Sequence, residues 1–180
     1  MELQEFLTQT QAEVRSEITD RLDSQNPYPY PESVFSEIVM NHMSEIGMTF
    51  EPMVCHYSAK VSNANLKLSG YAVSDESDQL DLFVSLYEGC DEITPISDSE
   101  AKTSAEQCLK FLSKCADGKI LNSMDESYDA YPLALLIHGC YRDLDQIRIY
   151  VLTDRYAKSK NFKAREISGK TVKLEVMDIE

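Results

Sequence analysis

Nucleophilic and metal-binding side chains are few in this chain, and their spacing limits what they can do. The cysteines and histidines are Cys55, Cys90, Cys108, Cys115, Cys140, His42, His56 and His138. No C-x-x-C pair occurs among them, so neither a zinc cage nor a disulfide framework is predicted, and free, mostly buried thiols are expected. Cys55 and His56 are neighbours in a predicted strand and therefore point to opposite faces, which argues against a thiolate–imidazole pair. His42 and His138 fall within apolar helical patterns and are expected to pack.

The motifs of several enzyme classes are missing. The sequence contains no G-x-x-x-x-G-K-[ST], G-x-G-x-x-G, G-x-S-x-G or H-E-x-x-H, which argues against nucleotide-binding loops, serine hydrolases and zinc proteases of the usual kinds. The six glycines are widely separated. They offer nothing from which a phosphate-cradling loop could be built.

Charge is the second source of chemistry. The 17 basic and 31 acidic residues give a formal net charge of −14, and a field of that sign excludes blanket electrostatic binding of DNA. Five basic residues nevertheless lie in a stretch without apolar periodicity, which predicts an exposed basic loop: Arg155, Lys158, Lys160, Lys163 and Arg165. Such a loop can contact phosphates locally if the acidic residues lie on another face, and the alternative is a merely solvated loop.

Two helices are predicted ahead of any strand. Residues 1–25 form the first, an amphipathic helix, and a proline-rich stretch at 26–31 is predicted to end it. The second helix is expected to begin near Pro31 and to end at Gly47. The apolar positions that carry the first helix are Leu3, Leu7, Val14, Ile18 and Leu22.

The hydrophobic period then changes to two, which is typical of strands. The predicted strands cover residues 53–58, 66–73, 80–87, 147–151 and 172–176. A capping box at Ser97–Glu100 predicts the start of a helix that Gly118 ends, and another helix is expected from about Asp129 through Cys140.

This order of elements predicts an α/β fold, with a mixed sheet flanked by helices and an extra helix at the N-terminus. We expect one domain over residues 30–180, preceded by the helix of residues 1–25. The chain has no run of 18 apolar residues and begins with an acidic stretch. A cytoplasmic protein without a membrane partner is therefore expected.

Four segments carry a family resemblance: Leu68–Ala72, Gln79–Val84, Ile149–Arg155 and Val176–Glu180. They resemble the N-terminal region of the abortive phage infection resistance protein family, and the resemblance covers roughly residues 55–180. The helix, three strands, helix and strand are similar to the core of the PD-(D/E)XK restriction-endonuclease-like fold. The resemblance implies a domain of a bacterial anti-phage defence protein, either as the N-terminal part of a longer chain or as a stand-alone relative.

A nuclease of this fold holds Mg²⁺ on two or three carboxylates and orients the attacking water with a lysine. The resemblance therefore implies a metal site in which Asp81 is joined by Glu37 or Glu45, with Lys67 as a displaced catalytic lysine. No other cofactor is expected.

Two positions depart from the family pattern. Ser69 stands where the family often has an aspartate, and Phe83 stands where the lysine of the fold is usual. We therefore expect a catalytically degenerate, nuclease-like module that binds or regulates, with residues 155–165 touching nucleic acid or a phage component. The alternatives are an active Mg²⁺-dependent nuclease and a protein-interaction module in which the N-terminal helix binds a partner helix or, as a homodimer, a second copy.

Overall fold

The structure is a computed structural model that describes residues 2–22 and 30–180. In this part of the chain the elements are α1 (Leu3–Asp20), α2 (Pro31–Glu45), β1 (Pro52–Val61), β2 (Ala64–Val73), β3 (Gln79–Leu86), β4 (Pro95–Ile96), α3 (Asp98–Ala116), η1 (Lys119–Asn122), α4 (Tyr131–Cys140), η2 (Tyr141–Asp143), β5 (Gln146–Thr153), β6 (Tyr156–Ala157), β7 (Asn161–Ile167) and β8 (Lys170–Met177).

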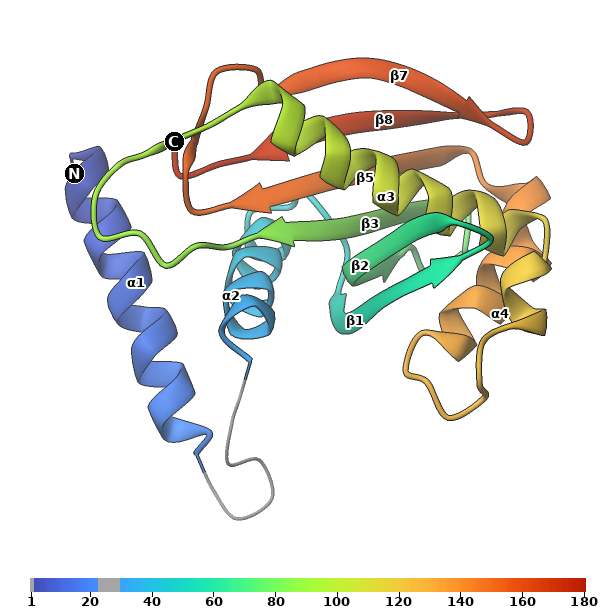
Figure 1. Cartoon of the computed structure of the whole chain (residues 1–180), viewed down its shortest axis with the longest axis horizontal. Coiled ribbons are helices and arrows are strands. Elements are labelled where there is room, and N and C mark those ends of the chain that lie inside the picture. The colour runs from blue at the N-terminus through green and yellow to red at the C-terminus, as the bar shows by residue number, and fades with distance from the viewer. Residues whose placement is uncertain (1, 23–29) are drawn as a thin grey trace.

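Six strands form one mixed sheet in the order β1-β2-β3-β5-β8-β7 (Figure 1). Strands β4 and β6 form a separate pair. The central strands β3, β5 and β8 run parallel, while β1, β2 and β7 pair antiparallel to their neighbours. The predicted hairpin of the second and third strands is confirmed as β2 and β3. The predicted α/β class, with helices flanking a mixed sheet and a further helix at the N-terminus, is also confirmed.

Each face of the sheet has its own hydrophobic core. On β3, Leu82 and Val84 belong to the larger core, which lies under α3 and α4. Phe83, one residue away, points to the other face and packs in a smaller core with Phe35 of α2 and Val14 of α1. The alternation along β3 therefore places successive side chains in two different cores, because both faces of the sheet are covered.

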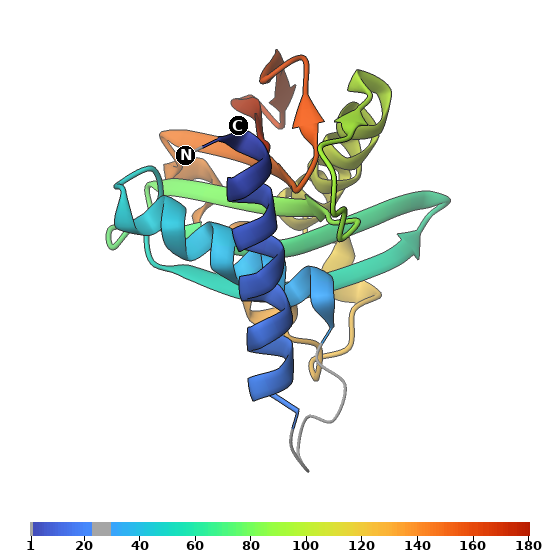
Figure 2. The ribbon, with the colours of Figure 1, turned by 90° about the vertical axis from the view of Figure 1, so that its left-hand side faces the viewer.

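The N-terminal helix packs on the domain. Figure 2 shows α1 lying across α2, and Leu7, Gln11 and Val14 of α1 are buried. None of the helices in the described ranges combines the length and apolar character needed to cross a bilayer.

The predicted sequence signals for the start of α3 and for the ends of α2 and α3 are confirmed. The amide of Glu100 donates to the hydroxyl of Ser97, and the Glu100 carboxylate accepts from the Ser97 amide, so the capping box that starts α3 is present. Gly47 and Gly118 follow α2 and α3 with positive φ angles. That conformation ends a helix and suits glycine.

Three predictions need correction. The stretch predicted as an exposed basic loop contains β6 and the edge strand β7, and Arg155 within it is buried. The first helix ends at Asp20, earlier than predicted, and the predicted stop at residues 26–29 lies outside the described residues. His42 and His138 are exposed rather than packed, because the buried stripes of α2 and α4 are narrower than their apolar patterns.

Candidate functional site

Asp81, the strand carboxylate predicted to bind metal, lies in β3 and is 1% exposed. Its neighbour across the parallel pair is Arg148 of β5, whose Nε and Nη2 donate to the two carboxylate oxygens at 2.7 Å each. The hydroxyl of Thr49 donates to Oδ2 at 2.6 Å. The hydrogen bond to Asp81 raises the pKa of Arg148 above its usual value. Both oxygens of Asp81 are therefore engaged by the protein.

The other two carboxylates predicted for the metal have surroundings of their own. Glu37 of α2 accepts from Arg21 at 2.6 Å, and Glu45 lies at the C-terminal end of α2, beside a cavity. In residues 2–22 and 30–180, no group of three or more histidine, cysteine or acidic side chains is placed to hold a metal ion. These residues do not fit a Mg²⁺ site, which needs oxygen ligands that the protein leaves open.

Lys67, predicted as the displaced catalytic lysine, lies under the N-terminal end of α2. Its ammonium donates to the backbone carbonyl of Ser85 at 2.8 Å and lies 3.4 Å from Oε1 of Glu32. The hydroxyl groups of Ser36 and Ser85 are 2.6 Å apart, and the Ser85 amide donates to Ser69 Oγ at 3.0 Å. Among these polar side chains there is one carboxylate, Glu32, and one ammonium group, Lys67, and their charges compensate each other.

Sequence reasoning missed Glu32 and Ser36. The signal available was their position in the first turns of a helix that opens with Pro31. Nothing local in the sequence shows that Lys67 crosses to them from β2.

The basic residues 155–165 are distributed among several ion pairs. Arg155 is 3.2 Å from Glu100 and 3.7 Å from Glu88. Arg165 of β7 pairs with Glu106 of α3.

Lys160 pairs with Asp178 and also lies 3.1 Å from Glu180. Lys158 and Lys163 are exposed and make no ion pair with the described residues. Of the five predicted phosphate contacts, these two keep a positive charge without an ion-pair partner in residues 2–22 and 30–180.

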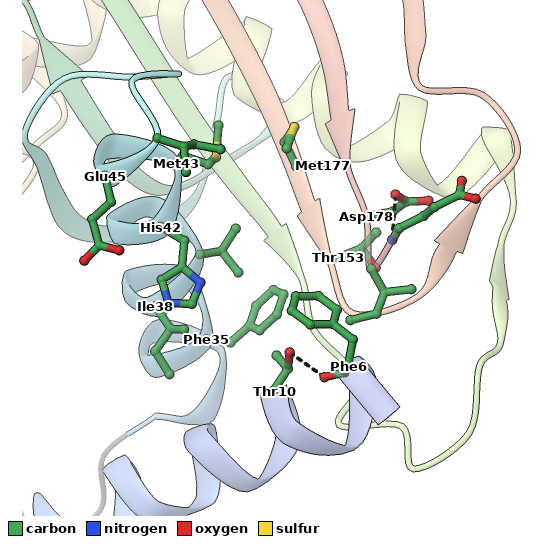
Figure 3. A pocket seen from close by; sticks show the side chains of 14 residues that line it. Phe6, Thr10, Phe35, Ile38, His42, Met43, Glu45, Thr153, Met177 and Asp178 are labelled. Carbon is green, nitrogen blue, oxygen red and sulfur yellow. Dashed lines mark hydrogen bonds between the residues drawn. The ribbon is translucent and has the colours of Figure 1, made fainter. Parts of the chain in front are cut away.

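A cavity of about 450 Å³ lies between α1, α2 and the C-terminal end of the chain (Figure 3). Phe6 of α1, Phe35 and Ile38 of α2 and Met177 of β8 give it a mostly apolar lining, and His42 lies at the same cavity. The lining offers apolar contact to a bound group rather than a convergent set of catalytic side chains.

A buried network that the sequence does not reveal ties α1 to the sheet. Asp154, which is fully buried just after β5, accepts from the backbone amides of residues 88, 89 and 90 at 2.8–3.1 Å. Gln11 of α1 donates to the same carboxylate at 2.8 Å and accepts from the Tyr87 hydroxyl at 2.6 Å. This network gives a buried charge its compensating donors and fixes α1 in place.

The three buried thiols are poor nucleophiles. Burial raises the pKa of Cys55 to about 11, and it also raises the pKa values of Cys108 and Cys115. His56, next to Cys55, is exposed while Cys55 is buried, as the strand alternation predicts. A thiolate is the reactive form of cysteine, so these positions do not support thiol catalysis at neutral pH.

Comparison with known proteins gives one family. The model of the family described as "Abortive infection phage resistance protein N-terminal domain" matches residues 35–180. No curated protein and no solved structure shows a significant match to the chain. The match begins within α2, so α1 lies outside it.

Proposed function

The chain belongs to the abortive infection phage resistance protein N-terminal domain family, and on that premise we propose that it is a catalytically silent, nuclease-like module that binds or regulates within a bacterial anti-phage defence protein. The order α2, β1, β2, β3, α3, β5 supports the proposed relation to the PD-(D/E)XK core. A cytoplasmic location is part of this proposal.

The pairing of Asp81 carries the proposal. Metal-dependent phosphodiester cleavage needs a carboxylate oxygen that is free to bind Mg²⁺, together with open positions for water and substrate. Arg148 and Thr49 satisfy both oxygens of Asp81, and the carboxylate is almost wholly out of contact with solvent. A guanidinium beside the carboxylate also supplies the positive charge that a metal would otherwise provide.

A cleavage assay tests the absence of catalysis. The purified chain is incubated with single- and double-stranded DNA and RNA in Mg²⁺ or Mn²⁺, and we expect no cleavage. Glu37→Gln and Glu45→Gln are assayed in parallel, with the exposed turn variant Glu76→Gln as the matched control. Metal-dependent cleavage that is lost in either of the first two variants and kept in the control would overturn the proposal.

Asp81→Asn is the obvious variant, but it is a poor one for this assay. Removing a charge from a buried ion pair destabilises the fold, so lost cleavage would not separate catalysis from unfolding. Glu37 is partly exposed and Glu45 is exposed, so we expect their replacement to leave the sheet intact.

The proposed binding role can extend to nucleic acid through Lys158 and Lys163. With two unpaired cations, the contact is expected to be weak, and its salt dependence should correspond to no more than about two phosphates. Binding of labelled RNA and DNA to the wild-type chain and to Lys158→Glu, measured from low to moderate salt, tests this. A steep salt dependence that Lys158→Glu does not change would place the binding surface elsewhere.

A further inference from the structure

The strand β7 forms one edge of the sheet. Figure 1 shows it as the outermost strand on the side away from β1, and within the described residues β8 is its only strand partner. Residues 163–166 along it are all exposed. The backbone groups on the outer side of such a strand are available to pair with another strand.

A bulge in β7 determines which of its side chains lie on each face of the sheet. The register with β8 shifts between Phe162 and Arg165. Phe162 and Ile167 pack against the core under α3, and Arg165 reaches Glu106 of α3. These three side chains share one face, so Lys163 and Glu166 lie on the other, because neighbouring residues alternate on either side of the bulge.

The pattern of β7 is complementary to itself. In an antiparallel pair of two β7 strands with a two-fold axis between Ala164 and Arg165, Lys163 of each strand lies opposite Glu166 of the other. Phe162 then lies opposite Ile167 of the second strand, and the bulge keeps each pair on a common face. Within the described residues, neither Lys163 nor Glu166 has an ion-pair partner in its own chain.

We propose that β7 pairs with β7 of a second copy of this chain, in this register, so that two six-stranded sheets become continuous across a two-fold axis. A lysine on an edge strand normally prevents pairing. Here the same strand supplies the carboxylate that neutralises the lysine at the position facing it across the axis. Opposite charges directly across an antiparallel pair are stabilising, and like charges are destabilising.

The other edge does not offer this match. Strand β1 begins at Pro52 and carries a single charged side chain, Lys60. Two copies of β1 therefore bring no pair of opposite charges together.

Pairing through β7 also affects the proposed contact with nucleic acid. It engages Lys163 with a carboxylate and leaves Lys158, which lies outside the strand, for the contact with phosphates. The two proposals therefore share Lys163, but Glu166 takes part only in the strand pairing and Lys158 only in the contact with nucleic acid, so variants at these two residues separate them.

Sedimentation equilibrium tests the proposal on the whole chain. A single strand pair is a small interface, so we expect a dimer with a dissociation constant in the micromolar range or weaker. Lys163→Glu and Glu166→Lys each place like charges opposite each other twice per dimer, and each should weaken the dimer about tenfold or more. The double variant Lys163→Glu with Glu166→Lys restores opposite charges and should return to within about threefold of wild type.

Lys60→Glu is the matched control, since it makes the same charge change on an exposed residue of β1, the opposite edge strand, and should leave dissociation unchanged. Thermal unfolding of each variant checks that the monomer still folds. A chain that stays monomeric up to about 1 mM overturns the proposal. A dimer that neither single variant weakens overturns it as well, and so does a double variant that fails to recover.

Discussion

Replacing Arg148 by methionine should cost a large part of the stability of this domain. Asp81 is 1% exposed and receives two of its three side-chain hydrogen bonds from Arg148. Arg148→Met therefore leaves a buried carboxylate with Thr49 as its remaining partner. Removing one member of a buried ion pair typically costs about 3 to 5 kcal/mol. Two charge-assisted hydrogen bonds of at least about 1.5 kcal/mol each account for the lower limit.

Urea unfolding followed by circular dichroism measures this loss at pH 7. For a chain of this length the same loss corresponds to a fall in melting temperature of roughly 6 to 20 °C. The exposed Arg142 is the matched control, and Arg142→Met should change the free energy of unfolding by less than about 0.5 kcal/mol. The double variant Asp81→Leu with Arg148→Met should be more stable than Arg148→Met alone, because it removes the unpaired charge.

A loss of unfolding free energy below about 1 kcal/mol in Arg148→Met would refute the view that the Asp81–Arg148 ion pair stabilises the sheet.

The same variant also tests the absence of a metal site. If Asp81 can bind a divalent ion once Arg148 is removed, Mn²⁺ should raise the melting temperature of Arg148→Met. We expect no rise, since the described residues place no further carboxylates around Asp81 to complete a site.

Three further predictions concern close contacts and burial. Gly70→Ala should lower the free energy of unfolding by about 1 to 3 kcal/mol, because the added Cβ would lie 2.5 Å from Sδ of Met40. Adding Met40→Ala to the same chain should recover part of this loss. If urea unfolding shows no recovery, the assigned contact is wrong. Gln11→Ala should lower the free energy of unfolding by about 2 to 3 kcal/mol, because it breaks the buried hydrogen bonds that connect α1 to Asp154. A loss below about 0.5 kcal/mol would show that other contacts hold α1 on the domain. Burial raises the pKa of Cys55 from 9.0 to about 11, so the unfolded chain loses this proton first and stability should fall as the pH rises from 9 to 11. The share of Cys55 in this fall is at most about 3 kcal/mol, and Cys108 and Cys115 add to it. Cys55→Val should therefore make the fall smaller, and an unchanged fall would assign it to the other groups.

Elements with a local signal could be predicted from the sequence. The capping box at Ser97 and Glu100 marks the start of α3 because both partners lie within one turn. Strand β3 is recognisable because its side chains alternate between two separate cores. Strand β7 was missed since most of its side chains face solvent, and an edge strand with polar residues leaves no apolar period to detect.

The candidate site was predictable only in part. The sequence identifies Asp81 as a strand carboxylate, but its partner Arg148 lies 67 residues away and meets it only through the parallel pairing of β3 and β5. Asp154 and Gln11 are separated by 143 residues. No spacing rule connects such pairs, since they depend on the topology of the sheet and on where α1 docks.

The same contacts explain why a binding role fits this domain better than catalysis. An active metal site has to leave ligand oxygens unsatisfied until ion, water and substrate arrive. On the face under α2, the oxygens of Asp81 are held by Arg148 and Thr49, and the hydroxyl of Ser85 is held by Ser36. Groups satisfied in this way stabilise the fold and gain nothing by rearranging around a ligand. Under the proposed binding role, recognition is expected to use the outer surface of the domain, where the edge of β7 has backbone and charged groups available to a partner.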